Sequence, residues 1–560
     1  MDRNIKIIAL GGLDEFGKAC YVIEIEDDIY VFDAGVKLPD KLTPGIDYLI
    51  ARFDYLIENK DRVRGYLISH GHDQVLGALP YFYRKVPAPV FCTSVTKFMI
   101  ESFMEHNHLD FKINFQIVKS GDHKMISQHE VSFFAVSHNI PGALGFAVAT
   151  DYGNIIYSGS FVILNSYEDA FSYDRTSLVN ILAKRPTLML LSDSCYSDRL
   201  GYTAPTHDIT PLAEPYFRKS KGRIFAAVLA PDIYTIYKFV LLAIKYNKKI
   251  ITYNDETKNI CFGITKSLNV TIPEKILGHR DDINRYPACD VLVLITGFFT
   301  RLFNSICLLA NGQNDDKRFV LNSNDTFIYG SRPDSETEIA YTESLDELYK
   351  ANVNKVVYFS KNSFCRMHPS QEDLKNLLNF TKPKYYLPVN GLYSKLITNA
   401  KMAVNMNIGL NYSNVFVIDN GGVIDIKDGI AKLSKDSVVA GDLYVDGIGL
   451  GKGNNQVMQE RSQLSEQGVI SLAAGISFVN KKISYGPNIK SKGLIYENEF
   501  EQINKDLTRL FTMTLNDEIV NKNNCDIESL KSITYDVIYR YIRRTTNRTP
   551  IILISLFEIN

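Results

Sequence analysis

Short apolar runs typical of β-strands alternate with stretches of helical pattern in the first part of the chain. Runs at 5–9, 20–25, 29–33 and 65–69 predict strands. Two further predicted strands, 132–136 and 155–157, lead into His138 and Ser158, as 65–69 leads into His70. We therefore expect the chemistry of this region to lie in loops at strand ends.

The pattern changes between residues 206 and 362, where strands and helices alternate regularly. Strands are predicted at 224–229, 249–253, 291–296 and 326–329, with a helix over 234–245. This alternation indicates an α/β unit that is distinct from the segments on either side.

The end of the chain has a pattern of its own. Asp526 is placed to cap a helix, and Arg543 and Arg544 lie near the carboxyl end, where cations suit the helix dipole. Apolar residues recur at helical spacing, namely Ile527, Leu530, Ile533, Val537 and Tyr541. Residues 550–556 predict a closing strand, and the glycine-rich segment 447–453 predicts a linker. The apolar helix face either drives association or fills the core of its own domain.

With 560 residues, the chain is too long for one hydrophobic core and predicts about three or four domains. Its apolar content of 45% and charged content of 22% are typical of a globular protein. No apolar run is long enough to cross a bilayer and no secretory segment follows the start, so we expect a cytoplasmic protein. The eight cysteines form no C-x-x-C pair, which favours reduced thiols.

The net charge of −1 provides no global basic field for nucleic acid. Contact with RNA would depend on local lysine clusters. The candidates are Lys245, Lys248 and Lys249, and Lys481, Lys482, Lys490 and Lys492. Such runs are more often an ordinary solvated surface.

The segment 69–77 carries half of a two-metal site. His70 and His72 have the spacing of an H-x-H-x-D-H motif, but Gln74 and Val75 occupy its last two ligand positions. A neutral amide is a poor ligand for a hard metal ion, and a valine offers no ligand atom. Part of the metal chemistry is therefore expected to be lost.

Further motifs occur in order along the whole chain, at 11–18, 32–35, 77–81, 191–194, 222–224, 310–312, 370–372, 382–385, 388–391, 446–447, 464–466 and 486–488. With segment 69–77, they resemble bacterial ribonuclease J of the metallo-β-lactamase and β-CASP RNA-processing family. The resemblance implies an α/β fold, in which an αββα sandwich carries an inserted β-CASP domain and a small α+β domain follows. The implied limits are 1–205 and 364–435 for the sandwich, 206–363 for the β-CASP domain, 436–468 for a linker and 469–560 for an association domain.

By this resemblance, His70, His72 and His138 would hold one metal ion, and three imidazoles with a water molecule make an open zinc site. The other ligand positions of the family fall on Gln74, Val75, Ser160 and Asn390. We therefore expect a single zinc ion at most and no second metal site. The alternative is that the three histidines are relics, hydrogen-bonded to one another and to Asp193.

Asp193 and His368 match the family's acidic motif and its phosphate-holding histidine. The candidates for binding RNA phosphate are His368, Ser370 and Arg366. The lost glycine before His368 and the proline after it reduce backbone flexibility and donors. Arg366 could compensate as a guanidinium clamp, or it is an ordinary surface arginine.

These features favour a degenerate ribonuclease J paralogue, a non-catalytic or weakly active RNA-binding subunit that forms a homo-oligomer or pairs with an active J-type ribonuclease. The first alternative is a weak, single-metal ribonuclease. The second is a repurposed interaction protein without an RNA role.

Overall fold

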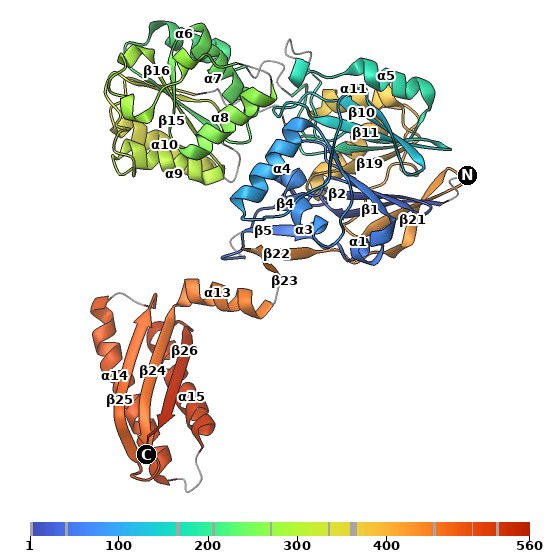
Figure 1. Ribbon diagram of the computed structural model, residues 1–560. Helices are drawn as coiled ribbons and strands as arrows, with labels where there is room; N and C mark the ends of the chain where they lie inside the picture. Colours follow the sequence, from blue (N-terminus) through green and yellow to red (C-terminus); the bar gives the residue numbers. More distant parts are fainter. Residues whose placement is uncertain are drawn as a thin grey trace. The chain divides into compact units, whose positions relative to one another are not determined.

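The computed structural model in Figure 1 describes residues 4–39, 43–163, 169–203, 208–268, 271–333, 337–358, 367–447, 449–451, 455–494, 497–521 and 526–559. The chain forms two compact units. One comprises Met1–Lys37 and Ile50–Asp442, and the other Leu38–Leu49 and Leu443–Asn560.

Two sheets form the body of the first unit. One contains, in spatial order, β21 (Ile430–Ser437), β20 (Gly422–Lys427), β1 (Asn4–Gly11), β2 (Cys20–Ile25), β3 (Asp28–Phe32), β6 (Val63–Leu67), β7 (Val90–Cys92) and β8 (Phe115–Ile117). The other contains β19 (Tyr385–Val389), β13 (Thr187–Asp193), β12 (Gly153–Tyr157), β11 (Leu144–Thr150), β10 (His129–Ala135) and β9 (His123–Ile126).

The two sheets share one hydrophobic core. Ile7 and Phe32 of the first sheet belong to the same buried cluster as Phe146 and Tyr157 of the second. The rings of Phe32 and Tyr157 stack with centroids 5.6 Å apart. Helices α5 (Arg175–Lys184), α11 (Gln371–Thr381) and α12 (Tyr393–Asn405) bury apolar residues on the other face of the second sheet. The predicted sandwich is therefore confirmed.

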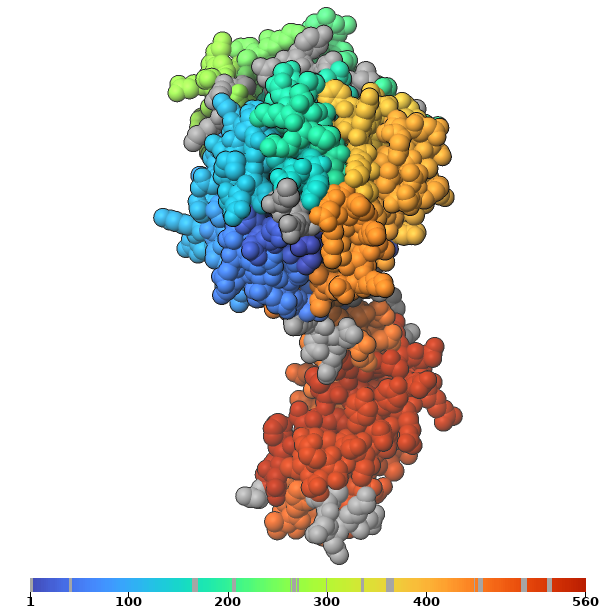
Figure 2. Space-filling view, turned by 90° about the vertical axis from the view of Figure 1, so that its right-hand side faces the viewer, coloured from blue at the N-terminus to red at the C-terminus, as the bar shows by residue number. Residues whose placement is uncertain are grey.

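Segments from both ends of the first unit build one sheet. β1 pairs with both β2 and β20, with Ile5 opposite Ile25 on one side and Ile426 on the other. Figure 2 shows the consequence, since blue N-terminal atoms lie against orange atoms of the later segment. The intervening α/β unit is thus an insertion into the sandwich.

The inserted unit is a parallel sheet with helices on both faces. Its strands, in spatial order, are β15 (Lys249–Thr252), β16 (Val291–Gly297), β14 (Ile224–Leu229), β17 (Thr326–Tyr329) and β18 (Lys355–Val357). Alternate residues of β14 enter different cores: Ala226 packs with α7 (Ile233–Lys245), and Ala227 packs with α9 (Phe299–Ala310) and α10 (Glu338–Lys350). Both faces are buried, which explains the continuous apolar runs of these strands.

The second unit ends in a three-stranded sheet, with β24 (Val469–Ser477) between β25 (Lys482–Lys492) and β26 (Ile551–Glu558). Helices α14 (Glu497–Asn521) and α15 (Ile527–Thr546) pack on one face of it. The Asp526 carboxylate caps α15 by accepting from the Ser529 amide, as predicted. Leu530 and Ile538 of α15 are buried among Ile470 and Leu472 of β24. The core face of this helix is Leu530, Ile538 and Ile542, whereas Ile533 and Val537 of the predicted stripe lie outside the core cluster.

The remaining elements are shorter or lie around these cores. They are β4 (Val36–Lys37), β5 (Tyr48–Ala51), α1 (Asp54–Glu58), α2 (Asp73–Leu76), α3 (Leu79–Tyr83), α4 (Ser94–His106), α6 (Thr210–Lys219), α8 (Asp255–Ser267), β22 (Asp442–Asp446), β23 (Gly449–Gly451) and α13 (Asn455–Gln467). The last three lie in the segment 436–468, which the resemblance implied as a linker. The domain limits themselves stay predictions.

Burial of the cysteines agrees with reduced thiols. The six described cysteines are free, and Cys20, Cys92, Cys195 and Cys261 are buried. Among the described helices, none combines the length and apolar character that a membrane crossing requires.

Candidate metal centre

Two loops at strand ends bring the candidate histidines together, since His70 and His72 share the loop between β6 and α2. His70 follows β6, His72 precedes α2 as its N-cap residue, and His138 follows β10. The backbone of α2 approaches the loop after β3 closely, because a Cβ atom on Gly35 would lie 1.6 Å from the carbonyl oxygen of Gln74. Only glycine fits at position 35, and α2 is thereby held against the loop after β3.

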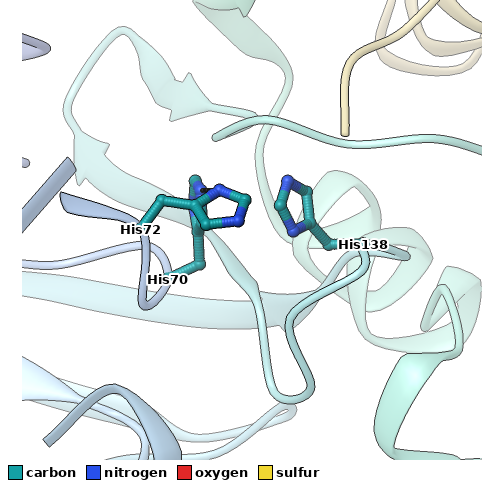
Figure 3. Close-up of side chains that lie close together, drawn as sticks. All are labelled: His70, His72 and His138. Atoms are coloured by element: carbon teal, nitrogen blue, oxygen red, sulfur yellow. Dashed lines mark hydrogen bonds between the residues drawn. The ribbon is translucent and has the colours of Figure 1, made fainter. Parts of the chain in front are cut away.

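The imidazole rings converge on one point, as Figure 3 shows. The ring centroids of His70 and His138 lie 4.4 Å apart, and those of His72 lie 4.8 and 4.9 Å from the other two. One nitrogen from each ring lies within 4.8 Å of the others, so that the three could hold a metal ion together. The predicted cluster is therefore present as a geometric unit.

Burial keeps these imidazoles neutral, which is the form that binds metal ions. It lowers the pKa of His72 to about 4. Burial, followed by the neighbouring histidines, lowers the pKa of His70 and His138 well below the usual value. A cluster of neutral, closely spaced imidazoles suits a cation of the zinc type.

The nitrogen atoms differ in how far they are satisfied. The His70 Nε2 and His72 Nδ1 atoms lie 3.1 Å apart, and the His72 Nε2 atom lies 3.3 Å from the carbonyl oxygen of Pro231. The His138 Nδ1 atom accepts from the Ile140 amide, but its buried Nε2 atom makes no hydrogen bond of ordinary geometry with any described residue. A buried, unsatisfied nitrogen beside two imidazoles fits a metal ion as its missing partner.

A buried carboxylate orients His70 through a serine, and the sequence did not single it out. The Ser69 hydroxyl lies 3.0 Å from His70 Nδ1 and donates to Asp33, which also accepts from the Ser69 amide at 2.7 Å. The Tyr157 hydroxyl donates to the same carboxylate at 2.6 Å. Burial raises the pKa of Asp33 to about 7. The F-D-A-G motif could have indicated this role, because a carboxylate commonly supports a histidine ligand from behind.

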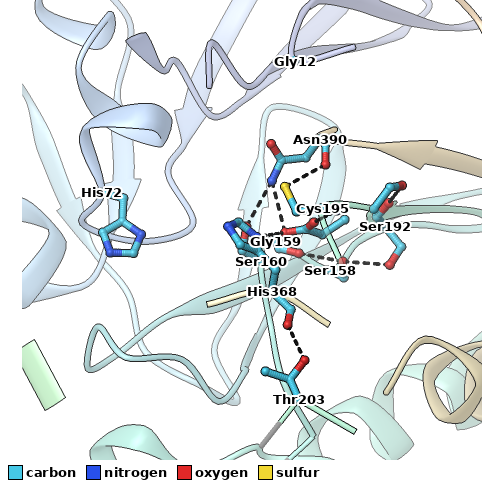
Figure 4. A network of polar contacts seen from close by, with 12 residues as sticks. Gly12, His72, Ser158, Gly159, Ser160, Ser192, Cys195, Thr203, His368 and Asn390 are labelled. Atoms are coloured by element: carbon cyan, nitrogen blue, oxygen red, sulfur yellow. Dashed lines mark hydrogen bonds and ion pairs between the residues drawn. The ribbon is translucent and has the colours of Figure 1, made fainter. Parts of the chain in front are cut away.

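Hydrogen bonds fill the space where a second set of ligands would be needed. The Asn390 side-chain amide donates to Asp193 at 3.1 Å and to the Ser160 hydroxyl at 3.3 Å. The other oxygen of Asp193 accepts from the Cys195 amide. Figure 4 shows the network around Asn390, Ser160 and His368, with His72 standing apart from it. Asp193 therefore bonds to His368, Asn390 and Cys195 rather than to His70, His72 or His138, as the alternative of relic histidines would have it.

The remaining two substituted positions belong to α2. The Gln74 carbonyl oxygen accepts from the Ala19 amide, and the Val75 side chain is buried. Neither residue provides a carboxylate or imidazole. Within the described part of the chain, the only other possible metal-holding group is Asp193, Cys195 and His368. Burial raises the pKa of the Cys195 thiol well above its usual value, which disfavours the thiolate that metal binding requires.

The two described phosphate candidates, His368 and Ser370, make different contacts. The His368 Nδ1 atom lies 2.7 Å from Asp193, and its ring meets the Tyr196 ring edge-on. Ser370 begins α11, where its amide donates to Asp373 and its hydroxyl lies 2.7 Å from that of Thr203. Arg366 falls outside the described residues. Of the two described candidates, only His368 contacts Asp193, and Ser370 is linked to His368 through Thr203, whose hydroxyl donates to the His368 carbonyl oxygen.

Comparison with known proteins identifies the family. The family model of the ribonuclease J β-CASP domain matches residues 221–348, and that of the ribonuclease J C-terminal domain matches residues 456–559. Proteins named ribonuclease J 2 from Staphylococcus epidermidis and Staphylococcus aureus are each 27% identical over 559 residues, which is 100% of this chain and 99% of theirs. The chain belongs to the ribonuclease J family.

Membership accounts for both the sandwich and the inserted sheet. A solved protein of unknown function from Enterococcus faecalis shares the fold at a TM-score of 0.52 and 14% identity, covering 76% of this chain and 100% of that chain. In this ribonuclease J family chain, the three histidines lie in the two-sheet body, and His72 contacts the carbonyl oxygen of Pro231.

Proposed function

We propose that this ribonuclease J family chain is a degenerate, non-catalytic or weakly active RNA-binding subunit that partners an active J-type ribonuclease in RNA processing or decay. The observation that carries the proposal is the pair of hydrogen bonds from Asn390 to Asp193 and Ser160. These bonds give the buried Asp193 carboxylate and Ser160 hydroxyl protein partners. A second metal ion at this place would instead need charged ligands, which Ser160 and Asn390 do not provide. The relatives named ribonuclease J 2 support RNA as the partner.

Hydrolysis by two metals requires one ion to activate water and the pair to stabilise the charge that develops at phosphorus. His70, His72 and His138 would hold one ion, which would lower the pKa of a bound water molecule. Gln74, Val75, Ser160 and Asn390 would leave a second ion without charged ligands. The positioning of Asp193 by Asn390 and His368 would remain, but stabilisation by a second ion would be lost.

Association would need surfaces other than the core face of α15, because that face is used inside its own domain. Among the strands that the structure describes, β25 and β26 each pair with β24 alone, so both edges of this sheet carry backbone groups without a strand partner. These edges support an assembly role for residues 469–560. The partner could be a second copy or an intact J-type subunit.

The experiment is to express this chain with a J-type ribonuclease that has all its metal ligands, and to measure mass by light scattering and cleavage of 5′-monophosphorylated RNA. We expect a mixed complex whose activity disappears when the metal ligands of the active subunit are replaced. Deleting residues 469–560 from this chain should prevent the complex while leaving the first unit folded. A chain that stays monomeric, both alone and in the mixture, would contradict the subunit role.

A weak, single-metal ribonuclease is the second candidate, favoured by the unsatisfied His138 Nε2 atom. The His72→Ala variant separates the two functions, because it should abolish any activity that depends on the three-histidine cluster. Activity that survives this change would come from a contaminating nuclease. An interaction protein without an RNA role, the third candidate, would show no affinity for RNA.

A further inference from the structure

We infer that the face of the small sheet opposite α14 and α15 binds single-stranded RNA, with bases stacked on Tyr485 and Phe557 and phosphates paired with lysines of β25. The inference rests on the proposed RNA-binding role and places an RNA contact outside the histidine cluster. It depends only on residues within the second unit.

The strand register defines the composition of this open face. Alternate residues of β24, such as Ile470 and Leu472, are buried against the helices, so the residues between them face away. The rows across the face are Lys492, Val469 and Ile551; Lys490, Ser471 and Leu553; Asn488, Ala473 and Ser555; and Tyr485, Gly475 and Phe557, followed by Lys482 opposite Ser477. The central strand therefore has mainly small side chains, between a lysine-bearing strand and an apolar one.

Two exposed aromatic rings flank a glycine at one end of the face. Tyr485 and Phe557 both lie opposite Gly475, and their exposed fractions are 78% and 62%. A Cβ atom on Gly475 would lie 2.1 Å from Ile559, so the glycine leaves room for an apolar side chain between the rings. Bases stack on such exposed rings irrespective of sequence.

The lysines of this face are free to meet phosphates. Lys482, Lys490 and Lys492 of β25 are exposed, and no ion pair joins them to any described residue. The other lysine cluster differs: Lys245 pairs with Glu214, and Lys248 donates to the Cys289 carbonyl oxygen. Of the two clusters that the sequence suggested, the structure favours the one on β25.

Charge distinguishes RNA from a second copy of the chain as the occupant. No carboxylate lies in any row of the open face. In a symmetric dimer built on this face, the lysines would meet only the same face of the partner and would lack a negative partner. A single strand of RNA supplies negative phosphates and stacking bases together.

The test measures binding of the full-length chain to a fluorescein-labelled uridine RNA of about 20 nucleotides by fluorescence anisotropy. Removing a stacking ring should weaken binding about fivefold or more, for both Tyr485→Ala and Phe557→Ala. Tyr485→Phe keeps the ring and should retain the wild-type affinity. The double variant Lys490→Ala, Lys492→Ala should lower the slope of log Kd against log salt by about 1.4.

The matched control is the double variant Lys505→Ala, Arg509→Ala, which removes the same charge from exposed positions of α14. It should leave the salt slope unchanged. Wild-type protein that binds no RNA would overturn both this inference and the RNA-binding role. Wild-type binding that all the sheet variants retain would overturn the inference alone. If the sheet variants change the mass in light scattering but not the RNA affinity, the face is an association surface and the inference is wrong.

Discussion

The candidate site has two halves, the three-histidine cluster and the network around Asn390, and their buried polar groups are satisfied in different ways. Around His138, three buried imidazoles approach one another, and the His138 Nε2 atom makes no hydrogen bond of ordinary geometry with any described residue. Around Asn390, a buried carboxylate and its neighbours are joined by hydrogen bonds. The first half has an arrangement that a cation would complete, whereas the second needs no cation. Loss of metal ligands can therefore be local, because a short amide is sufficient to satisfy the groups that remain.

The largest effect expected from this comparison is on catalysis. Without charged ligands for a second ion, hydrolysis of 5′-monophosphorylated RNA should be at least about a thousandfold slower than in a relative with all ligands. Single-turnover kinetics with purified protein would measure the difference. The His72→Ala protein, prepared in the same way, reports the background from contaminating nuclease. Robust 5′-to-3′ degradation that His72→Ala abolishes would show that the second half is not required.

Metal content gives the next largest effect. Elemental analysis should find at most one zinc or manganese ion per chain, and His138→Ala should weaken binding by about 100-fold or more, since it removes one of three ligands. His368→Ala is the matched control, because His368 belongs to the Asp193 network, and it should retain the ion. Two tightly held ions per wild-type chain would show that the region around Asn390 also binds a metal ion, and would contradict the comparison.

Sequence patterns predicted most of the framework. The strands at 20–25, 224–229 and 326–329 have the predicted bounds, because their apolar runs are bounded by clear breaks. The pattern could not reveal the supports of the site, since Asp33 and Tyr157 are far apart in sequence and meet only when the two sheets pack. Nor could it show that Ser370 engages Thr203, which depends on how the start of α11 packs.

A smaller effect concerns stability against pH in the metal-free protein. The pKa of His72 is about 4 when folded and about 6.5 in an unfolded chain, so the unfolded chain binds the extra proton between these values. His72 therefore stabilises the fold fully above about pH 6.5, by up to about 3 kcal/mol, and this contribution is lost as the pH falls towards 4. Asp33 acts in the opposite direction, because its raised pKa makes the folded chain bind a proton up to about pH 7.

A difference measurement removes the contribution of Asp33. Chemical denaturation of wild type and His72→Asn, both with a chelator, should show the stability gap between them shrinking as the pH is lowered from 7.5 to 4.5. A constant gap for His72→Asn would mean that the imidazole is not held neutral by burial.

The smallest effect tests the support behind His70. The Tyr157 hydroxyl donates to Asp33, and a hydrogen bond to a charged group contributes about 1.5–3 kcal/mol, against about 0.5–1.5 kcal/mol for a neutral pair. Because the pKa of Asp33 is about 7, Tyr157→Phe should cost more at pH 8.5, where the carboxylate is ionised, than at pH 5.5. Tyr386→Phe removes a buried hydroxyl that donates to the neutral Asn399, so its cost should be the same at both pH values. Equal costs for Tyr157→Phe at the two pH values would show that Asp33 does not change charge in this range. The carboxylate would then support His70 either as an anion or as a neutral acid throughout the range from pH 5.5 to 8.5.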